Sequence, residues 1–200
     1  MGKGIKMKKK LICFIGVLIA AIIIFLGVSI YRDIREEITD IKKYEKVLGE
    51  KGKYKENLVG YNDIFPNSLE NAENVEAFHY LYYNPWDPNY FGYLVCTYSE
   101  KQFEEEVSRL KSLDSTEYEG IYGIEKFPYE LCAVYADSYY GEIYAVADST
   151  KYRIAYVSLE FCNYFTDIKY EQRMDKDYLP TGFNANPGNE TRKAFEQGAK

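Results

Sequence analysis

Residues 131–161 read LCAVYADSYYGEIYAVADSTKYRIAYVSLEF, three apolar runs joined by two short polar stretches. The runs are Leu131–Ala136, Glu142–Asp148 and Tyr152–Phe161, and their Val, Ile and Tyr content favours strands. The links are short enough for hairpins, and strands joined in this way pair antiparallel. This stretch therefore predicts a three-stranded antiparallel meander, which decides the fold class.

Two more strand candidates precede this meander, at residues 75–83 and 90–98, with a proline-containing turn between them. Ser99 then predicts the start of a helix, because Gln102 follows at the capping-box spacing and an apolar stripe continues at helical intervals. The order of elements predicts an α+β fold: an antiparallel sheet of about five strands with a packed helix.

The start of the chain carries an uncharged apolar run, Leu11–Ile30, behind a lysine-rich stretch. Twenty helical residues at about 1.5 Å each match a bilayer core of roughly 30 Å. We therefore expect a single transmembrane helix over residues 11–31, with the lipid bilayer as its partner. Signal-peptide apolar regions usually span about 7–15 residues, so we expect an anchor that is retained rather than cleaved.

Basic residues also follow the apolar run (Arg32, Arg35, Lys42, Lys43 and Lys46), so the count on the two sides is nearly level and the position of the lysines decides the expected orientation. Four of them lie within five residues of the apolar run on its N-terminal side: Lys6, Lys8, Lys9 and Lys10. Positive charge favours the cytoplasmic side. This predicts a cytoplasmic tip at residues 1–10 and a domain outside the cell, in a single-pass protein of the cell membrane. The layout suits a bacterial surface protein.

The remaining boundaries come from spacing and composition. Ile34, Ile38 and Ile41 recur at steps of three and four, which predicts a helical juxtamembrane stalk over residues 32–56. An extracytoplasmic α+β domain is then expected over residues 57–179. Glycine and proline recur after Pro180, so residues 180–200 are expected to form a flexible tail.

Charge excludes one class of partner. Five of the 25 basic residues and none of the 31 acidic ones lie in the first 31 positions, leaving 20 against 31, a net charge near −11. Such a domain repels phosphate backbones, so no nucleic-acid partner is expected. No zinc or other metal spacing is present, and no cofactor is expected. A disulfide among Cys96, Cys132 and Cys162 and the oligomeric state both stay open.

Catalytic candidates are few. His79 is the single histidine, and on a strand it would share a face with three apolar residues, Val75, Ala77 and Leu81. Asp137 and Asp148 could serve acid–base chemistry, but successive antiparallel strands place them at opposite ends of the sheet. No catalytic residue is assigned, and the balance is against an enzyme.

The best surface candidate is an aromatic cluster around the turn at residues 84–89. Aromatic rings beside amides and carboxylates suit a glycan face or a protein partner, because they lose little entropy on binding. The predicted binding residues are Tyr82, Tyr83, Trp86, Asp87, Tyr90 and Tyr93.

The function expected from these features is a membrane-anchored extracytoplasmic binding module for a protein or a cell-wall glycan. Two alternatives stay open. One is an exported hydrolase that uses Asp or Glu. The other is an accessory or immunity-type subunit that acts through its membrane helix.

Overall fold

A computed structural model describes residues 14–28, 35–53, 63–83, 89–161 and 168–198. The chain divides into two compact units, Met1–Glu36 and Glu37–Lys200. In the first unit, residues 14–28 form a helix whose side chains are all exposed. Among the described residues, no helix combines the length and the apolar character that a membrane crossing requires. Residues 11–13 and 29–31 of the expected span lie outside the described ranges.

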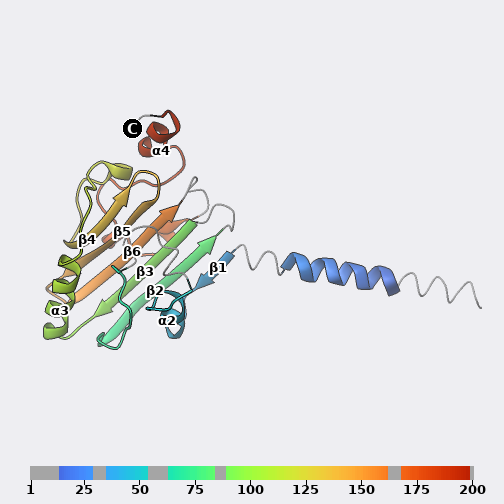
Figure 1. Ribbon diagram of the computed structural model, residues 1–200, viewed down its shortest axis with the longest axis horizontal. Coiled ribbons are helices and arrows are strands. Elements are labelled where there is room, and N and C mark those ends of the chain that lie inside the picture. The colour runs from blue at the N-terminus through green and yellow to red at the C-terminus, as the bar shows by residue number, and fades with distance from the viewer. Residues whose placement is uncertain (1–13, 29–34, 54–62, 84–88, 162–167, 199–200) are drawn as a thin grey trace, which may run out of the picture. The chain divides into compact units, whose positions relative to one another are not determined.

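The fold is α+β and is built on one six-stranded sheet. Its strands are β1 (Arg35–Ile38), β2 (Asn74–Tyr83), β3 (Asn89–Thr97), β4 (Glu130–Asp137), β5 (Gly141–Asp148) and β6 (Arg153–Phe161). They lie in the order β1-β2-β3-β6-β5-β4 (Figure 1). The pairs β2–β3, β3–β6, β6–β5 and β5–β4 are antiparallel, so the predicted meander and the upstream strand pair are confirmed.

The longest helix of the second unit is α3 (Glu100–Lys111), at the predicted place. Its N-cap is Ser99, whose side-chain oxygen accepts from the backbone N–H of Gln102. The other helical segments are short: η1 (Ile41–Lys43), α2 (Tyr44–Val47), η3 (Ile121–Gly123), η4 (Tyr170–Gln172), η5 (Lys176–Tyr178) and α4 (Glu190–Glu196).

Both faces of the sheet are covered, and tyrosine is prominent in both cores. The first face carries residues such as Tyr80 and Tyr156 and is covered by α2 and α3, which contribute Tyr44 and Phe103. The second face carries Phe91, Tyr144 and Val157 and is covered by residues 118–129 and 168–185, which contribute Tyr122 and Tyr170. Because water reaches neither face, β3 and β5 read as almost continuous apolar runs.

The segment that follows residue 34 differs from the expected helical stalk. It forms strand β1, then the short helices η1 and α2, and these bury Ile38, Tyr44 and Val47 on the first face. Spacing of three and four residues fits a long helix, but it also fits a short edge strand followed by two short helical segments. Contacts with the sheet select the second arrangement, and local periodicity does not encode those contacts.

The C-terminal segment also differs from the expected flexible tail. Residues 180–198 are described, α4 forms within them, and Ala185 and Arg192 are buried. The backbone N–H of Tyr122 donates to the Thr191 hydroxyl over 2.7 Å, and the backbone N–H of Asn184 donates to the Tyr122 carbonyl over 2.8 Å. These bonds attach the segment to η3, so glycine and proline here mark tight turns rather than loose chain.

A bulge in β2 changes which residues share a face. The pairing with β3 shifts register between Val75 and Ala77. A bulge places two residues opposite one, so the alternation of faces is interrupted. Val75 therefore packs with the first face and Ala77 with the second, and the expectation that Val75 shares the face of His79 and Leu81 is wrong.

Candidate functional site

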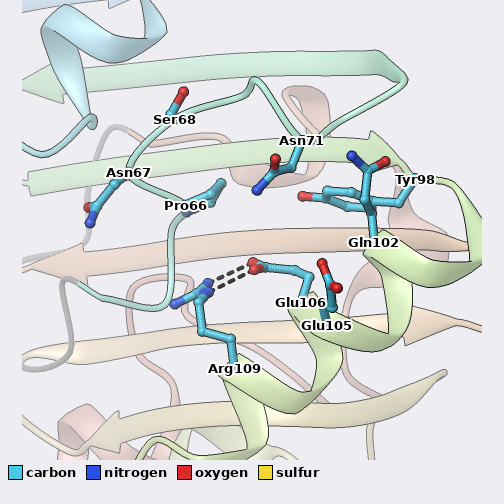
Figure 2. Close-up of a pocket in the computed structure, with 9 residues that line it drawn as sticks. All are labelled: Pro66, Asn67, Ser68, Asn71, Tyr98, Gln102, Glu105, Glu106 and Arg109. Atoms are coloured by element: carbon cyan, nitrogen blue, oxygen red, sulfur yellow. Dashed lines mark hydrogen bonds and ion pairs between the residues drawn. The ribbon is translucent and has the colours of Figure 1, made fainter.

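A cavity of about 350 Å³ lies between α3 and the segment of residues 66–71 (Figure 2). We refer to it as the α3 pocket. Much of its lining is polar and uncharged, with an exposed carboxylate at its side: Asn67, Ser68, Asn71, Gln102 and Glu105. Its volume is near the lower end of ligand pockets, which span roughly 300–1,000 Å³, so it suits a small ligand or one unit of a larger one.

The helix supplies one wall of the pocket through simple spacing. Gln102, Glu105, Glu106 and Arg109 recur at steps of three and four, so they lie along one stripe of α3. The neighbouring stripe contains Phe103 and Leu110 and packs into the first-face core. The acidic run at residues 104–106 reads in sequence as an ordinary solvated face. Its relation to Arg109 at i+3 is the signal by which the pocket could have been found.

Arg109 fixes the geometry of this wall. Its Nε donates to Glu106 Oε2 over 2.7 Å and its Nη2 donates to Glu106 Oε1 over 2.6 Å, the two dashed lines in Figure 2. The guanidinium also donates to the backbone carbonyls of Asp63 and Ile64, at 2.6 and 3.1 Å. A bidentate pair with these additional bonds restricts both side chains, and it also ties α3 to the segment that forms the opposite wall.

A chain of hydroxyl groups runs from the pocket into the core. Tyr156 donates from its hydroxyl to Glu106 Oε1 over 2.7 Å, and the Tyr98 and Tyr156 hydroxyl oxygens are 2.8 Å apart. Since the Tyr156 O–H is the donor in the bond to the carboxylate, the Tyr156 oxygen is the acceptor in the second bond and the Tyr98 hydroxyl is its donor. Burial is the largest cause that raises the pKa of both tyrosines, so both stay neutral donors. In Figure 2 the Tyr98 hydroxyl points toward Asn71.

This arrangement favours binding over catalysis. Glu106 already accepts hydrogen bonds from two Arg109 nitrogens and from Tyr156, so its carboxylate is not placed to take a proton from a ligand. Cys96 lies next to this network, but burial raises the pKa of its thiol to about 12, which disfavours the nucleophilic thiolate. In the described ranges, no three His, Cys, Asp or Glu side chains are grouped to hold a metal ion.

The aromatic residues predicted from the sequence do not share one surface. The Tyr82 and Tyr90 rings are 5.4 Å apart, and Tyr90 is buried on the first face. Tyr93 is three positions further along β3, so it points to the opposite face, where its ring is 6.2 Å from that of Tyr178. Tyr83 is half-buried. Trp86 and Asp87 lie outside the described residues.

The titratable residues singled out in the sequence have structural partners. His79 Nε2 is 2.7 Å from Glu37 Oε1, and its ring meets Phe91 edge-on at 5.6 Å. Asp137 pairs with Gly141 at one end of β5 and Asp148 pairs with Arg153 at the other, so the predicted separation of the two aspartates is confirmed.

Each aspartate stabilises its own turn. Asp137 Oδ1 accepts from the backbone N–H groups of Tyr139 and Tyr140 at 2.7 and 2.8 Å. Asp148 Oδ1 accepts from the Thr150 backbone N–H at 3.0 Å and from its hydroxyl at 2.6 Å. Both are Asx-type turn contacts, which account for the two aspartates without a catalytic role.

Two of the cysteines are described, and both are free thiols in the first-face core, Cys96 and Cys132. Cys162 lies outside the described residues. Comparison of the chain with protein-family models, curated proteins and solved structures finds no match.

Proposed function

We propose that this protein is a membrane-anchored, extracytoplasmic binding module and that the α3 pocket holds its ligand. The observation that carries the proposal is the lining of this pocket. Asn67, Asn71 and Gln102 line it with amide groups, a type of group that both donates and accepts hydrogen bonds. Within this lining, Gln102 Oε1 accepts from the Ser99 hydroxyl over 2.8 Å and the Ser68 hydroxyl donates to Glu45 over 3.2 Å. A glycan carries hydroxyl and amide groups that match such a lining, so a cell-wall glycan is the ligand class that we favour.

Preorganisation supports the same proposal. The Glu106–Arg109 pair and the Tyr98–Tyr156 chain hold this wall of the pocket before any ligand arrives. Binding sites that are already ordered lose less conformational entropy when they bind. The charged pair is satisfied internally, so the site favours a neutral polar ligand over a strongly charged one.

The anchor is the second part of the proposal. The helix at residues 14–28 exposes large apolar side chains throughout, including Phe25 at 71% and Ile24 at 66%. An apolar surface of this extent is unfavourable in water and favourable in lipid. With the uncharged run Leu11–Ile30 and the lysines before it, this supports a membrane segment with the N-terminus inside and the domain outside.

The membrane part is tested with the full-length protein carrying a C-terminal tag in a bacterial host. We expect the protein to stay in the membrane fraction after alkaline carbonate extraction. We also expect protease added to intact spheroplasts to remove the tag. Release by carbonate would refute the anchor, and a tag that is protected until lysis would refute the orientation.

The ligand part is tested with the full-length protein in mild detergent. Solubilised cell-wall glycan fragments are titrated against the wild type, Asn71→Ala and the control Asn74→Ala, whose exposed amide lies outside the pocket. We expect Asn71→Ala to weaken binding at least tenfold and the control to bind as the wild type does. Binding that survives Asn71→Ala unchanged would place the ligand elsewhere.

An accessory membrane subunit is the second candidate, and the exposed apolar helix at residues 14–28 is the observation that favours it. Replacing residues 11–30 by an unrelated apolar helix separates the two functions. The binding module keeps its activity after the exchange, whereas an accessory subunit that acts through its helix loses it. Crosslinking in native membranes would then identify a protein partner of that helix.

A further inference from the structure

A second cavity, of about 380 Å³, lies on the other face of the sheet from the α3 pocket. It is bordered by β2, β3 and the start of β6, and by the segment that joins η4 to η5. Two arginines from different elements line it, together with two carboxylates and two tyrosines: Arg153, Arg173, Glu76, Asp175, Tyr93 and Tyr178. We call it the arginine pocket.

Arg173 is held in place from one side. Its Nε is 3.0 Å from Glu37 Oε1, which also lies 2.7 Å from His79 Nε2, and its Nη1 donates to the Lys169 carbonyl over 3.3 Å. Within the part of the chain that the structure describes, Nη2 makes no hydrogen bond. The side chain is 14% exposed, so this guanidinium is ordered and has an N–H edge available.

Arg153 is held in a similar way. Its Nε donates to Glu76 Oε1 over 2.8 Å and its Nη2 is 2.8 Å from Glu76 Oε2, while Nη1 donates to the Tyr178 hydroxyl over 3.3 Å. A guanidinium held by a bidentate carboxylate keeps a fixed plane. The pocket is therefore ordered at both arginines before a ligand arrives.

The pocket is lined by charges of both signs, and Glu37 pairs with Arg173 from outside the lining. Two guanidinium groups face two carboxylates, those of Glu76 and Asp175. Asp175 uses Oδ1 to accept from the Asp177 backbone N–H over 3.0 Å, and in the described residues its Oδ2 accepts no hydrogen bond. The pocket thus offers a donor edge for an anionic group and an acceptor for a cationic group. Its remaining wall includes the apolar side chains of Ala77, Val95 and Met174.

We infer that the arginine pocket binds a small zwitterion of the amino-acid type. The ligand carboxylate is bound at Arg173 and its ammonium at Asp175, while its side chain packs on the apolar wall. Arginine is the residue best suited to bind a carboxylate in a plane. A ligand with several negative charges is disfavoured, because the domain around the site is itself acidic. This site is separate from the α3 pocket and does not depend on the function proposed for it.

The test uses the full-length protein in mild detergent and calorimetric titration with each of the twenty free amino acids up to 10 mM, a concentration roughly at the weak end of measurable affinity. We expect at least one of them to bind saturably. We expect its N-acetyl and amide derivatives, which each lack one charge, to bind at least tenfold more weakly. No saturable binding by any amino acid, or equal binding by the derivatives or by inorganic phosphate, would overturn the inference.

Variants locate the site. Asp175→Asn removes the proposed ammonium partner but can still cap η5, and we expect it to lose at least tenfold in affinity. The matched control is Asp177→Asn, which changes an exposed residue two positions away. Arg173→Lys keeps the charge and loses the planar edge, and it should weaken binding as well. Unchanged affinity in Asp175→Asn would refute the site. Arg109 lines the α3 pocket and not the arginine pocket, so zwitterion binding that persists in Arg109→Gln separates this inference from the proposed function.

Discussion

The hydroxyl of Tyr156 donates to the Glu106 carboxylate over 2.7 Å, and this bond joins strand β6 to helix α3. Tyr156 is fully buried, and the Glu106 side chain is 14% exposed. The bond therefore lies where water competes weakly for either group. It connects the sheet core to the wall of the α3 pocket, so the stability of the fold and the order of the pocket depend on the same contact.

Tyr156→Phe is expected to lower the free energy of unfolding by about 1.5–3 kcal/mol, the usual contribution of a hydrogen bond to a charged group. The variant also leaves the Tyr98 hydroxyl without its acceptor. Urea unfolding of the full-length protein in detergent measures the change. Tyr152→Phe is the control, because that ring is 37% exposed and its hydroxyl is hydrogen-bonded to Glu100 at the surface, a contact whose loss should change stability little. Equal unfolding midpoints for the two variants would show that the buried bond contributes nothing.

Glu142 is expected to make stability fall as pH rises. Its side chain is fully buried on the second face, and within the described chain neither carboxyl oxygen has a hydrogen-bond partner. Burial raises its pKa well above the ordinary value of 4.5. At a pH below 4.5 the carboxyl group is protonated in both the folded and the unfolded chain. At a pH between 4.5 and the raised pKa the unfolded chain ionises while the folded chain keeps its proton, so the free energy of unfolding decreases over that interval.

Glu142→Met removes this dependence and is expected to raise the free energy of unfolding at pH 7 by about 1–3 kcal/mol, since a buried polar group without a partner is replaced by an apolar one of similar shape. Unfolding is measured between pH 4 and 8. The wild-type and variant curves should diverge with rising pH. Parallel curves would mean that Glu142 does not titrate differently in the folded state.

Gly123→Ala is expected to destabilise the attachment of the C-terminal segment. At Gly123 a methyl group would lie 2.7 Å from the Gly182 carbonyl oxygen, and φ is +78°. The strained backbone costs roughly 1–2 kcal/mol and the overlap about 1–3 kcal/mol more. Gly188→Ala is the control, because Gly188 has a similar φ of +82° but no atom within 4 Å of the added methyl group. This variant should therefore show the cost of the strained backbone without the cost of the overlap. The difference between their unfolding free energies measures the close approach.

Asp148→Ala is expected to cost about 0.5–1.5 kcal/mol, because it removes the acceptor of the Thr150 turn contacts. Asp148→Asn keeps an acceptor oxygen in the same place and should lose less. Both variants are compared by thermal unfolding, and ligand binding at the α3 pocket should be unchanged in both. A binding loss in Asp148→Asn without loss of stability would return this residue to the list of functional candidates.

Local sequence determined the elements whose signals are local. The strands at β2 to β6 and helix α3 were predicted because alternation, turn chemistry and the Ser99–Gln102 cap act over a few residues. The separation of Asp137 and Asp148 followed from the direction of successive strands. The sequence also showed the apolar, lysine-flanked run Leu11–Ile30, which supports the proposed anchor.

Tertiary structure decided the contacts between distant segments. In the sequence Glu106 is one residue of an acidic run. In the fold it lines the α3 pocket and accepts a hydrogen bond from Tyr156, 50 residues away. The predicted cluster with Tyr90 and Tyr93 separates onto two faces, because a sheet covered on both sides buries both sets of side chains. Residues 180–198 pack on η3 through Thr191 and Asn184. The hydrogen bonds between distant segments, and the side chains that those segments bury, depend on the tertiary path of the chain. A local sequence pattern does not specify that path.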